Sequence, residues 1–460
     1  MAPNIWVFFT GWAIFQLILW RAKWLSRLAM DAVAVVDALM AGLPEEEKLK
    51  LVERRNVRLL GSLGLVLILL IAAGGMGWLL LWVGETSLDV KVTWGFMGWT
   101  AFSLGATLPF LFLSKPVGPY TPIQQLFHHL VLDSPHLGKA LFKKEVKRVS
   151  KGEIEKDQPF VIVTGLARAG TTALMNALYQ TGKFASLNYA HMPFIMAPGT
   201  WSKWYKPKYK GSKERIHNDG IEVRLDSTEA LEEYFFCAYD DYVQQSTLQE
   251  YALTAEKAVD YSHYRSIFVA ASGAEKRYLA KNNNALLRFA SMVDHYPMMR
   301  MVVLFRHPLY HANSLMQIHE RFTDEQAKDP FFLTYMNWLG HFEFGQNIKA
   351  FNWADGTSMP DKQPKTMDDW LQRWMAYYER VLALRNNQMI LIGYDTFCQS
   401  PNRVVGALLK ELSMEIPESN HSSYINKRKL PSGASPEMAA RAMELYHRLL
   451  KEENALTSEA

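Results

Sequence analysis

The sequence predicts an α/β fold, in which helices flank a P-loop-like parallel β-sheet and a module of three transmembrane helices precedes it. Two observations predict the sheet. Residues 160–164 and 301–305 are short, wholly apolar runs, each followed by a polar loop and a helical pattern, as is typical of buried parallel strands. One observation predicts the membrane module: residues 1–113 contain three long apolar runs without a charged side chain.

The three apolar runs cover about residues 5–20, 59–83 and 92–113. A helix needs about 20 mostly apolar residues to cross ~30 Å of hydrocarbon, and the second and third runs reach that length. The first run is shorter, but Trp6 and Trp20 lie where interface aromatics belong. The alternative is an uncleaved signal sequence, although a basic start and a small-residue cleavage site are missing. We therefore expect a transmembrane module over residues 1–113.

The loop charges predict the orientation. Residues 84–91 contain one basic side chain, Lys91. Residues 21–58 contain eight: Arg21, Lys23, Arg27, Lys48, Lys50, Arg54, Arg55 and Arg58. The positive-inside rule places the longer loop, and the chain after the third run, in the cytoplasm. The expectation is a multi-pass protein of the inner or plasma membrane with a cytoplasmic catalytic domain. A Golgi membrane protein with a lumenal domain is the alternative.

Two polar segments adjoin the apolar runs. The spacing of Leu25, Leu28, Val35, Val36 and Leu39 predicts an amphipathic helix, either on the membrane surface or as a solvated connector. Residues 114–157 predict a basic juxtamembrane linker that begins with proline and glycine and continues as a lysine-rich helix. Such a helix is either solvated or docks on anionic lipid.

A phosphate loop is predicted at the start of the catalytic domain, residues 158–460. The strand at 160–164 leads to Gly165 and Gly170, which have the spacing of a P-loop, and then to a helix. Backbone N–H groups at a helix N-terminus attract anions. Thr171 stands where P-loop NTPases have their lysine. The alternative is a tight turn followed by ordinary capping threonines.

A second motif follows the strand at 301–305, where Arg306-His307-Pro308 begins a helix that bears Ser314. Together the two motifs resemble the sulfotransferases that use 3′-phosphoadenosine 5′-phosphosulfate (PAPS), over residues 158 to 415, in a membrane-anchored bacterial branch related to tyrosylprotein and heparan enzymes. The resemblance implies that Arg306 and Ser314 hold the 3′-phosphate. It implies that the first loop holds the phosphosulfate through Gly165, Arg168, Ala169, Gly170, Thr171 and Thr172.

The resemblance also bears on the catalytic base and the leaving group. The related branches use a carboxylate after the second strand, but residues 182–200 contain no acid, and His191 is the good proton acceptor there. An imidazole suits this work because its ordinary pKa of ~6.5 lies near the working pH. A loop histidine without a chemical role is the alternative. Lys281 resembles the family lysine that stabilises charge on the leaving phosphate, and Asn283 stands where the cytosolic enzymes have a histidine.

Other residues are predicted around this centre. His217, Asp219 and Glu233 lie in a segment that looks like the acceptor side of the bacterial branch, although acids on a helix are more often simply solvated. Trp370, Trp374 and Tyr378 have helical spacing and predict a buried face.

The predicted reaction is transfer of a sulfuryl group from PAPS, without a metal, to a hydroxyl or amine of a lipid or lipid-linked acceptor in the bilayer. A net charge of +4 gives no sign of a nucleic-acid partner. Two alternatives belong to other classes: a P-loop nucleotide kinase or GTPase, and a catalytically inactive membrane nucleotide-binding protein. The oligomeric state and the acceptor stay open.

Overall fold

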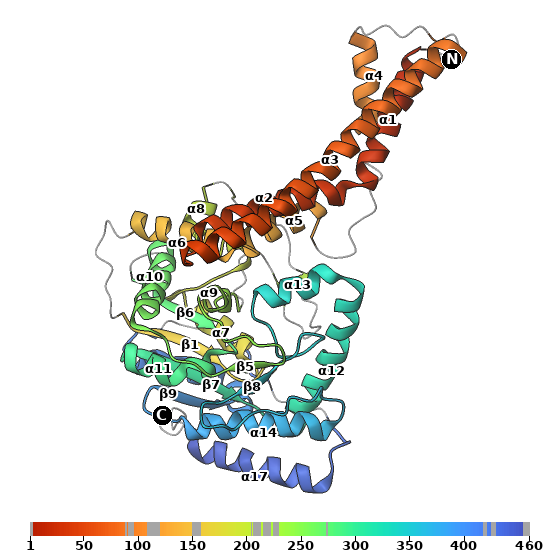
Figure 1. The fold of residues 1–460 in the computed structure, drawn as a ribbon. Coiled ribbons are helices and arrows are strands. Elements are labelled where there is room, and N and C mark those ends of the chain that lie inside the picture. The colour runs from red at the N-terminus through yellow and green to blue at the C-terminus, as the bar shows by residue number, and fades with distance from the viewer. Residues whose placement is uncertain are drawn as a thin grey trace. The chain divides into compact units, whose positions relative to one another are not determined.

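The computed structural model describes residues 3–87, 90, 96–107, 120–149, 158–203, 205, 213–214, 222–223, 230–272, 275–416, 421–424 and 429–453. The chain forms two compact units, residues 1–137 and 138–460. The first is helical, and the second contains the β-sheet (Figure 1). The helices of the first unit are α1 (Pro3–Trp20), α2 (Ala22–Met40), α3 (Glu45–Ser87), α4 (Phe96–Thr107) and α5 (Pro122–Leu132).

Helices α2 and α3 form a hairpin, which confirms the helix expected over residues 25–39. The hydroxyl of Ser62 on α3 donates a hydrogen bond to Asp31 on α2, so the two helices are paired rather than independent. Helix α3 has 43 residues, which at 1.5 Å per residue makes it ~65 Å long, about twice the hydrocarbon thickness. The charged first part of α3, before the apolar run that begins at Leu59, therefore lies outside the length needed to cross the hydrocarbon.

Helix α1 packs against α3 and α4 at glycines. The indole N–H of Trp6 donates to the carbonyl oxygen of Leu80 at 2.8 Å. A Cβ at Gly84 would collide with the Trp6 ring, and one at Gly105 with the carbonyl oxygen of Phe8. Small residues that bring helix backbones this close are typical of packing between membrane helices, where lipid offers no hydrophobic drive for association.

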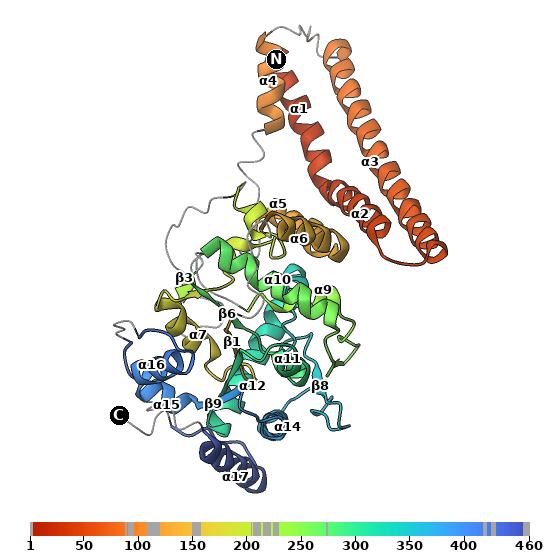
Figure 2. The same cartoon turned by 90° about the vertical axis from the view of Figure 1, so that its left-hand side faces the viewer.

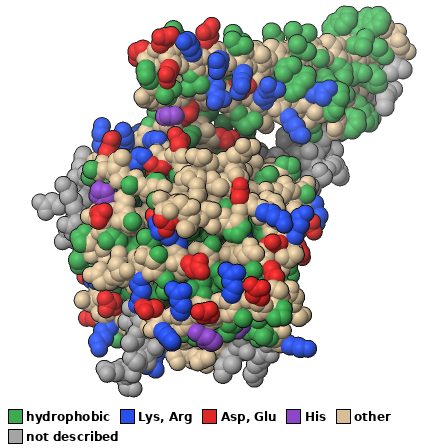
Figure 3. Space-filling model, turned by 60° about the horizontal axis from the view of Figure 1, so that its bottom comes forward, with side chains coloured by type: hydrophobic (Ala, Val, Ile, Leu, Met, Phe, Trp, Pro, Cys, Tyr) green, Lys and Arg blue, Asp and Glu red, His purple; other side chains and the backbone are tan. Residues whose placement is uncertain are grey.

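Two described helices are long and apolar enough to cross a membrane: α1 with 18 residues and α3 with 43. The third expected span, 92–113, is described only over α4, which has 12 residues. The rest of that span lies outside the described residues, so three spans are not established. Hydrophobic side chains gather on the first unit in Figure 3. Large apolar side chains of α3, such as Leu67, Ile71 and Trp78, are exposed.

The second unit is built on a five-stranded, wholly parallel sheet with the order β2-β6-β1-β7-β9. This confirms the predicted α/β fold. Its strands are β1 (Phe160–Thr164), β2 (Phe184–Ala185), β6 (Arg277–Lys281), β7 (Met299–Phe305) and β9 (Met389–Gly393). Two small sheets pair β3 (Lys213–Glu214) with β4 (Glu222–Val223), and β5 (Thr247–Gln249) with β8 (Ala350–Asn352).

Helices cover both faces of the sheet (Figure 2). One face, with Val161 and Val163, packs on α7, α15 and α16. On the other face the Phe160 ring lies under the Arg265 guanidinium, 3.7 Å away. The remaining elements are α6 (Pro135–Val149), α7 (Thr171–Gln180), η2 (Tyr189–His191), α8 (Pro198–Trp201), α9 (Glu233–Tyr239), α10 (Ala255–Ser272), η3 (Ala285–Arg288), α11 (Phe289–His295), α12 (Pro308–Lys328), α13 (Pro330–Trp338), α14 (Met367–Ala383), α15 (Tyr394–Gln399), α16 (Pro401–Glu411) and α17 (Pro436–Glu452).

The part of α6 that belongs to the second unit, residues 138–149, is packed into that unit's core. Phe142 is fully buried and lies edge-on to Phe235, with ring centroids 6.0 Å apart. The buried carboxylate of Glu145 accepts a hydrogen bond from the Thr200 hydroxyl at 2.5 Å. The sequence analysis placed these residues in a linker ending at 157, whereas residues 138–149 pack into the second unit.

Candidate active site

The phosphate loop has the backbone shape that its glycines allow. Gly165 and Gly170 have φ of +151° and +101°, and Arg168 has φ of +74°. Such values are rare for residues with a side chain. A Cβ at Gly170 would collide with the ring of Tyr394 at the start of α15. The loop then enters α7, whose first turn holds the buried Thr171 and Thr172. This is the predicted strand, loop and helix N-terminus.

Helix α12 fastens the second motif to this loop. His311 donates from Nε2 to the carbonyl oxygen of Ala167 at 2.7 Å, and its Nδ1 accepts the indole N–H of Trp374 at 3.2 Å. One turn later, Ser314 accepts a hydrogen bond from Arg168 Nε at 3.2 Å. The structure therefore brings the two predicted anion-binding motifs into direct contact.

Arg306 leaves the carboxyl end of β7 beside the same loop. Its guanidinium lies over the ring of Tyr394, 4.9 Å from the centroid. The same tyrosine packs against Gly170, so one aromatic ring separates Arg306 from the N-terminus of α7. The sequence analysis missed Tyr394. Its position directly after a buried strand was the available signal, because carboxyl ends of parallel strands share one edge.

His311 stays neutral because burial lowers its pKa to about 3. The unfolded histidine takes up a proton below pH ~6.5, and the folded one does so only near pH 3, so this group's stabilising effect is complete above pH 6.5 and is lost on acidification. We expect the free energy of unfolding of the wild type to fall by about 2 kcal/mol between pH 7 and pH 5 because of His311.

In a His311→Gln variant, the free energy of unfolding should fall by about 2 kcal/mol less between pH 7 and pH 5 than in the wild type, although the variant is less stable at pH 7. The comparison is made by thermal unfolding of full-length protein in detergent at both pH values. Burial also lowers the pKa of His191, to about 4, but that contribution is common to both proteins and cancels. Equal acid losses in wild type and variant would contradict this account of His311.

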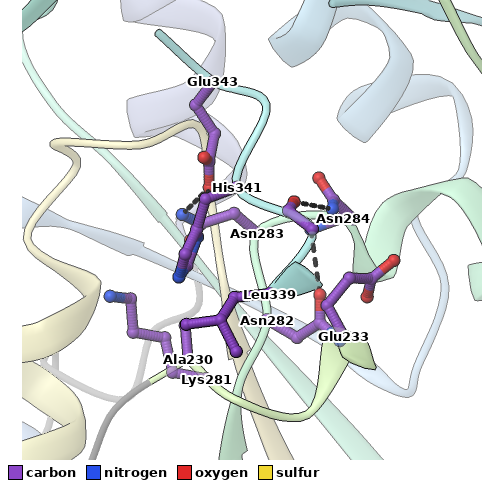
Figure 4. Close-up of a pocket in the computed structure, with 10 residues that line it drawn as sticks. Ala230, Glu233, Lys281, Asn282, Asn283, Asn284, Leu339, His341 and Glu343 are labelled. Atoms are coloured by element: carbon purple, nitrogen blue, oxygen red, sulfur yellow. Dashed lines mark hydrogen bonds and ion pairs between the residues drawn. The ribbon is translucent and has the colours of Figure 1, made fainter. Parts of the chain in front are cut away.

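A small pocket lies beside the phosphate loop, at the end of β6. Lys281 pairs in register with Val163 of β1, and the Asn282 N–H donates to the Val163 carbonyl oxygen at 3.0 Å. The pocket is lined by Ala230, Glu233, Lys281, Asn282, Asn283, Asn284, Leu339, Gly340, His341 and Glu343 (Figure 4). Lys281 ends a strand, as the sequence analysis expected, and its role at the leaving phosphate stays a prediction.

Three consecutive asparagines after Lys281 hold two other segments in place. Asn282 donates to Glu232 at 2.9 Å, Asn283 to Glu343 at 2.6 Å, and Asn284 to the carbonyl oxygen of Gly340 at 2.8 Å. Asparagine cannot take up a proton near neutral pH, but it can position neighbours that do. His341 and Glu343 were not predicted, because they follow α13, far from β6 in the chain.

Glu233 lines the pocket, but its carboxylate is already engaged. Arg288 pairs with both of its oxygens, and the Tyr242 hydroxyl also donates to it. Both Glu233 and Arg288 are almost fully buried. A charge pair of this kind accounts for the residue structurally, and contact with an acceptor stays a prediction. His217 and Asp219 lie outside the described residues.

His191 is separate from this pocket. It ends η2, where its Nδ1 accepts the backbone N–H of Asn188 at 3.1 Å. Its ring lies edge-on to Phe268 on α10, 5.3 Å away. Its depressed pKa weakens it as a proton acceptor near neutral pH. Its role as base stays a prediction that this placement does not favour.

No group of three or more His, Cys, Asp or Glu side chains suited to a metal ion occurs among the described residues. The lack of a metal requirement stays a prediction, because it concerns the reaction rather than the fold.

Comparison with known proteins finds a similarity for one part of the chain. Residues 159–342 match the family model described as the sulfotransferase family. No curated protein is matched by the sequence.

Solved bacterial sulfotransferases are also similar to the chain. STF1 from Mycobacterium tuberculosis H37Rv is 14% identical, with a TM-score of 0.36, over 75% of this chain and 86% of its own. STF9 from Mycobacterium avium is 11% identical, with a TM-score of 0.37, over 80% and 86%. A sulfotransferase from Alicyclobacillus acidocaldarius is 14% identical, with a TM-score of 0.26, over 66% and 97%.

Proposed function

We propose that the protein is a membrane-bound sulfotransferase that moves a sulfuryl group from PAPS to a hydroxyl or amine of a lipid or lipid-linked acceptor. The observation that carries the donor assignment is the junction of the two anion motifs. Arg168 in the phosphate loop contacts Ser314, and His311 from the same helix holds the loop carbonyl of Ala167. A donor with phosphate groups at both its 5′ and 3′ positions matches this pair of adjoining sites.

Each part of the site has a role in this proposal. The backbone N–H groups from Gly165 to Thr172 bind the 5′-phosphosulfate at the N-terminus of α7, and Arg306 with Ser314 binds the 3′-phosphate. The acceptor oxygen or nitrogen forms a bond to sulfur while the bond from sulfur to the 5′-phosphate oxygen breaks. Adenosine 3′,5′-bisphosphate leaves, and the acceptor's proton passes to a base.

Fixed cations carry the charge that develops in this step. Lys281 at the end of β6 and Arg168 in the loop flank the predicted position of the transferring group. Each preorganised donor aimed at developing charge lowers the activation barrier by a few kcal/mol. In phosphoryl transfer by kinases Mg²⁺ carries much of this charge, and here the two side chains and the loop amides do so.

The rival functions fit the site less well. A P-loop kinase or GTPase needs the lysine for which this chain has Thr171. An inactive nucleotide-binding protein has no need for a lysine at this position, at the end of β6 beside the loop.

The membrane helices support an amphiphilic acceptor. A soluble acceptor needs no membrane module, whereas a lipid would reach the enzyme at high effective concentration in the bilayer. Trp201 stacks between Phe194 and Tyr205, at 4.8 and 5.1 Å, and Tyr205 is exposed. Exposed aromatic clusters of this kind favour the membrane interface.

Transfer of label tests this proposal. Full-length protein in vesicles, supplied with ³⁵S-labelled PAPS and a lipid extract of the source cells, should label a lipid. The matched truncation begins at Ser134, because a cut near Gln158 would remove the buried Phe142. We expect the truncated protein to sulfate short-chain, water-soluble analogues normally but native extract at least ~10-fold more slowly.

Two results would contradict the proposal. Equal rates of both proteins on native extract would make the membrane unit a mere anchor and remove the lipid argument. Transfer of phosphate from ATP, with no transfer from PAPS, would overturn the reaction itself. The difference in loop charge also supports a cytoplasmic catalytic unit, and a topology reporter fused after Ala460 distinguishes this placement from a lumenal one.

A further inference from the structure

The chemical question that the proposed function leaves open is which group takes the acceptor's proton. The pocket beside Lys281 holds one histidine, His341, and it lies next to the carboxylate of Glu343. Figure 4 shows the imidazole of His341 between Glu343 and Lys281. The position therefore combines a proton acceptor with a cation at the edge of the sheet where the phosphate loop begins.

The backbone that carries His341 is held firmly. Helix α13 ends in a Schellman motif, in which the N–H of His341 donates to the Met336 carbonyl oxygen at 3.0 Å and that of Gly340 to Asn337 at 3.2 Å. Gly340 has φ of +68°, and a Cβ there would collide with Glu233. The carbonyl oxygen of His341 accepts the Asn347 amide at 2.9 Å. The imidazole is thus placed by a helix end rather than by a long loop.

Glu343 is suited to orient this imidazole. Its Oε1 lies 3.6 Å from His341 Nδ1 and accepts the Asn283 amide at 2.6 Å. Burial favours the neutral carboxyl, but the opposite charge of His341 and the hydrogen bonds outweigh burial, and the pKa of Glu343 is lowered. An ionised carboxylate beside one ring nitrogen favours a proton there and leaves the other nitrogen free to accept one.

The polar atoms of this cluster are incompletely satisfied, as expected of a site that awaits a ligand. Among the described residues, Glu343 Oε2 and the side-chain oxygen of Asn283 are buried without a hydrogen-bond partner. Most buried polar atoms in folded proteins have one. His341 keeps 16% of its side chain exposed, so a small acceptor group can reach it.

The other candidates for the base are less well placed. Glu232 accepts hydrogen bonds from Tyr261, Tyr278 and Asn282, at 2.6 to 2.9 Å. Glu233 is paired with Arg288. His191 lies outside the pocket lining and uses Nδ1 to accept a backbone N–H. Of the groups near Lys281, His341 alone among the described residues combines access, a proton-accepting nitrogen and an orienting carboxylate.

We propose that His341 is the general base of the reaction and that Glu343 is its positioning residue. This inference rests on the proposed sulfotransferase function. As the acceptor oxygen or nitrogen bonds to sulfur, its proton passes to the free ring nitrogen of His341. The resulting imidazolium is stabilised by Glu343, which stays ionised, and Lys281 stabilises the departing phosphate. The proton, the electron pair and the leaving group are thereby all accounted for.

The experiment uses full-length protein in vesicles with ³⁵S-labelled PAPS and the lipid extract. It measures single-turnover transfer, with titration of adenosine 3′,5′-bisphosphate as the readout of donor binding. His341→Ala should lower transfer about 100- to 10,000-fold, with nucleotide affinity changed less than about twofold. Added imidazole should restore part of the rate in His341→Ala, because it can occupy the vacated space and accept the proton.

Matched variants separate chemistry from folding. His341→Gln keeps size and polarity but cannot act as a base, so it should bind nucleotide and lose transfer without imidazole rescue. Glu343→Gln should lower transfer less than His341→Ala does. His263→Gln, on α10 and outside the pocket lining, should transfer at the wild-type rate.

The outcomes are distinct. Near-normal transfer by His341→Gln, or loss of transfer only in a His191→Gln variant, would overturn His341 as the base. If His341→Ala fails to bind nucleotide, His341→Gln decides in its place. A wild type that neither binds the nucleotide nor transfers label would instead overturn the sulfotransferase proposal.

Discussion

Replacing Arg168 with alanine is expected to lower the rate of sulfuryl transfer about 100- to 1,000-fold, the usual cost of losing one fixed donor at a developing charge. The affinity for adenosine 3′,5′-bisphosphate should fall much less, because that product lacks the transferring group. Single-turnover transfer of ³⁵S and calorimetric titration of the nucleotide measure the two quantities. Equal losses of rate and affinity would assign Arg168 to nucleotide binding instead.

The control for Arg168 follows from its backbone. At φ of +74°, an alanine is strained by about 1 kcal/mol relative to glycine. Arg168→Gly relieves that strain while also removing the guanidinium and its bond to Ser314. A rate loss shared by both variants therefore reports the guanidinium. Recovery in the glycine variant would show that transfer does not depend on the guanidinium.

Replacing Arg306 with alanine should weaken binding of adenosine 3′,5′-bisphosphate roughly 10- to 100-fold, as expected for loss of a charge-assisted contact worth about 1.5–3 kcal/mol. Binding of adenosine 5′-phosphate should hardly change, since it lacks the 3′-phosphate. Both affinities are measured by calorimetry on the full-length protein.

Arg300 provides the matched control for Arg306. It lies on the same strand, β7, but its guanidinium is 3.5 Å from Glu411, away from the phosphate loop. Arg300→Ala should leave both affinities unchanged. If Arg306→Ala weakens both nucleotides equally, the 3′-phosphate is bound elsewhere.

The elements with strong local patterns were predictable from the sequence. β1, β9 and residues 301–305 of β7 are mostly or wholly apolar runs, and each is a buried part of the sheet. The glycine spacing identified the phosphate loop for the same reason: only certain residues tolerate its backbone. Trp370, Trp374 and Tyr378 were correctly predicted to be buried.

The contacts between distant segments were not predictable. Nothing in the local pattern around Trp374 indicates that its indole holds His311, 63 positions away. His341 and Glu343 were not predicted because they line the pocket from the segment after α13. Asn283 donates a hydrogen bond to Glu343, which lies 60 positions later in the chain. A single sequence contains the residues of such contacts but not the pairing, which depends on tertiary packing.

The bond between Trp374 and His311 has a consequence for biosynthesis. The phosphate loop emerges from the ribosome early, yet its anchor His311 follows Ala167 by 144 positions and Trp374 follows later still. At a translation rate of about 5–20 residues per second, His311 and Trp374 are synthesised on the order of ten seconds or more after the loop. Tyr394, beneath Gly170, is made after both. A nascent chain should therefore be unable to retain the nucleotide until synthesis is nearly finished, and premature termination beyond the family domain would still yield a protein without a donor site.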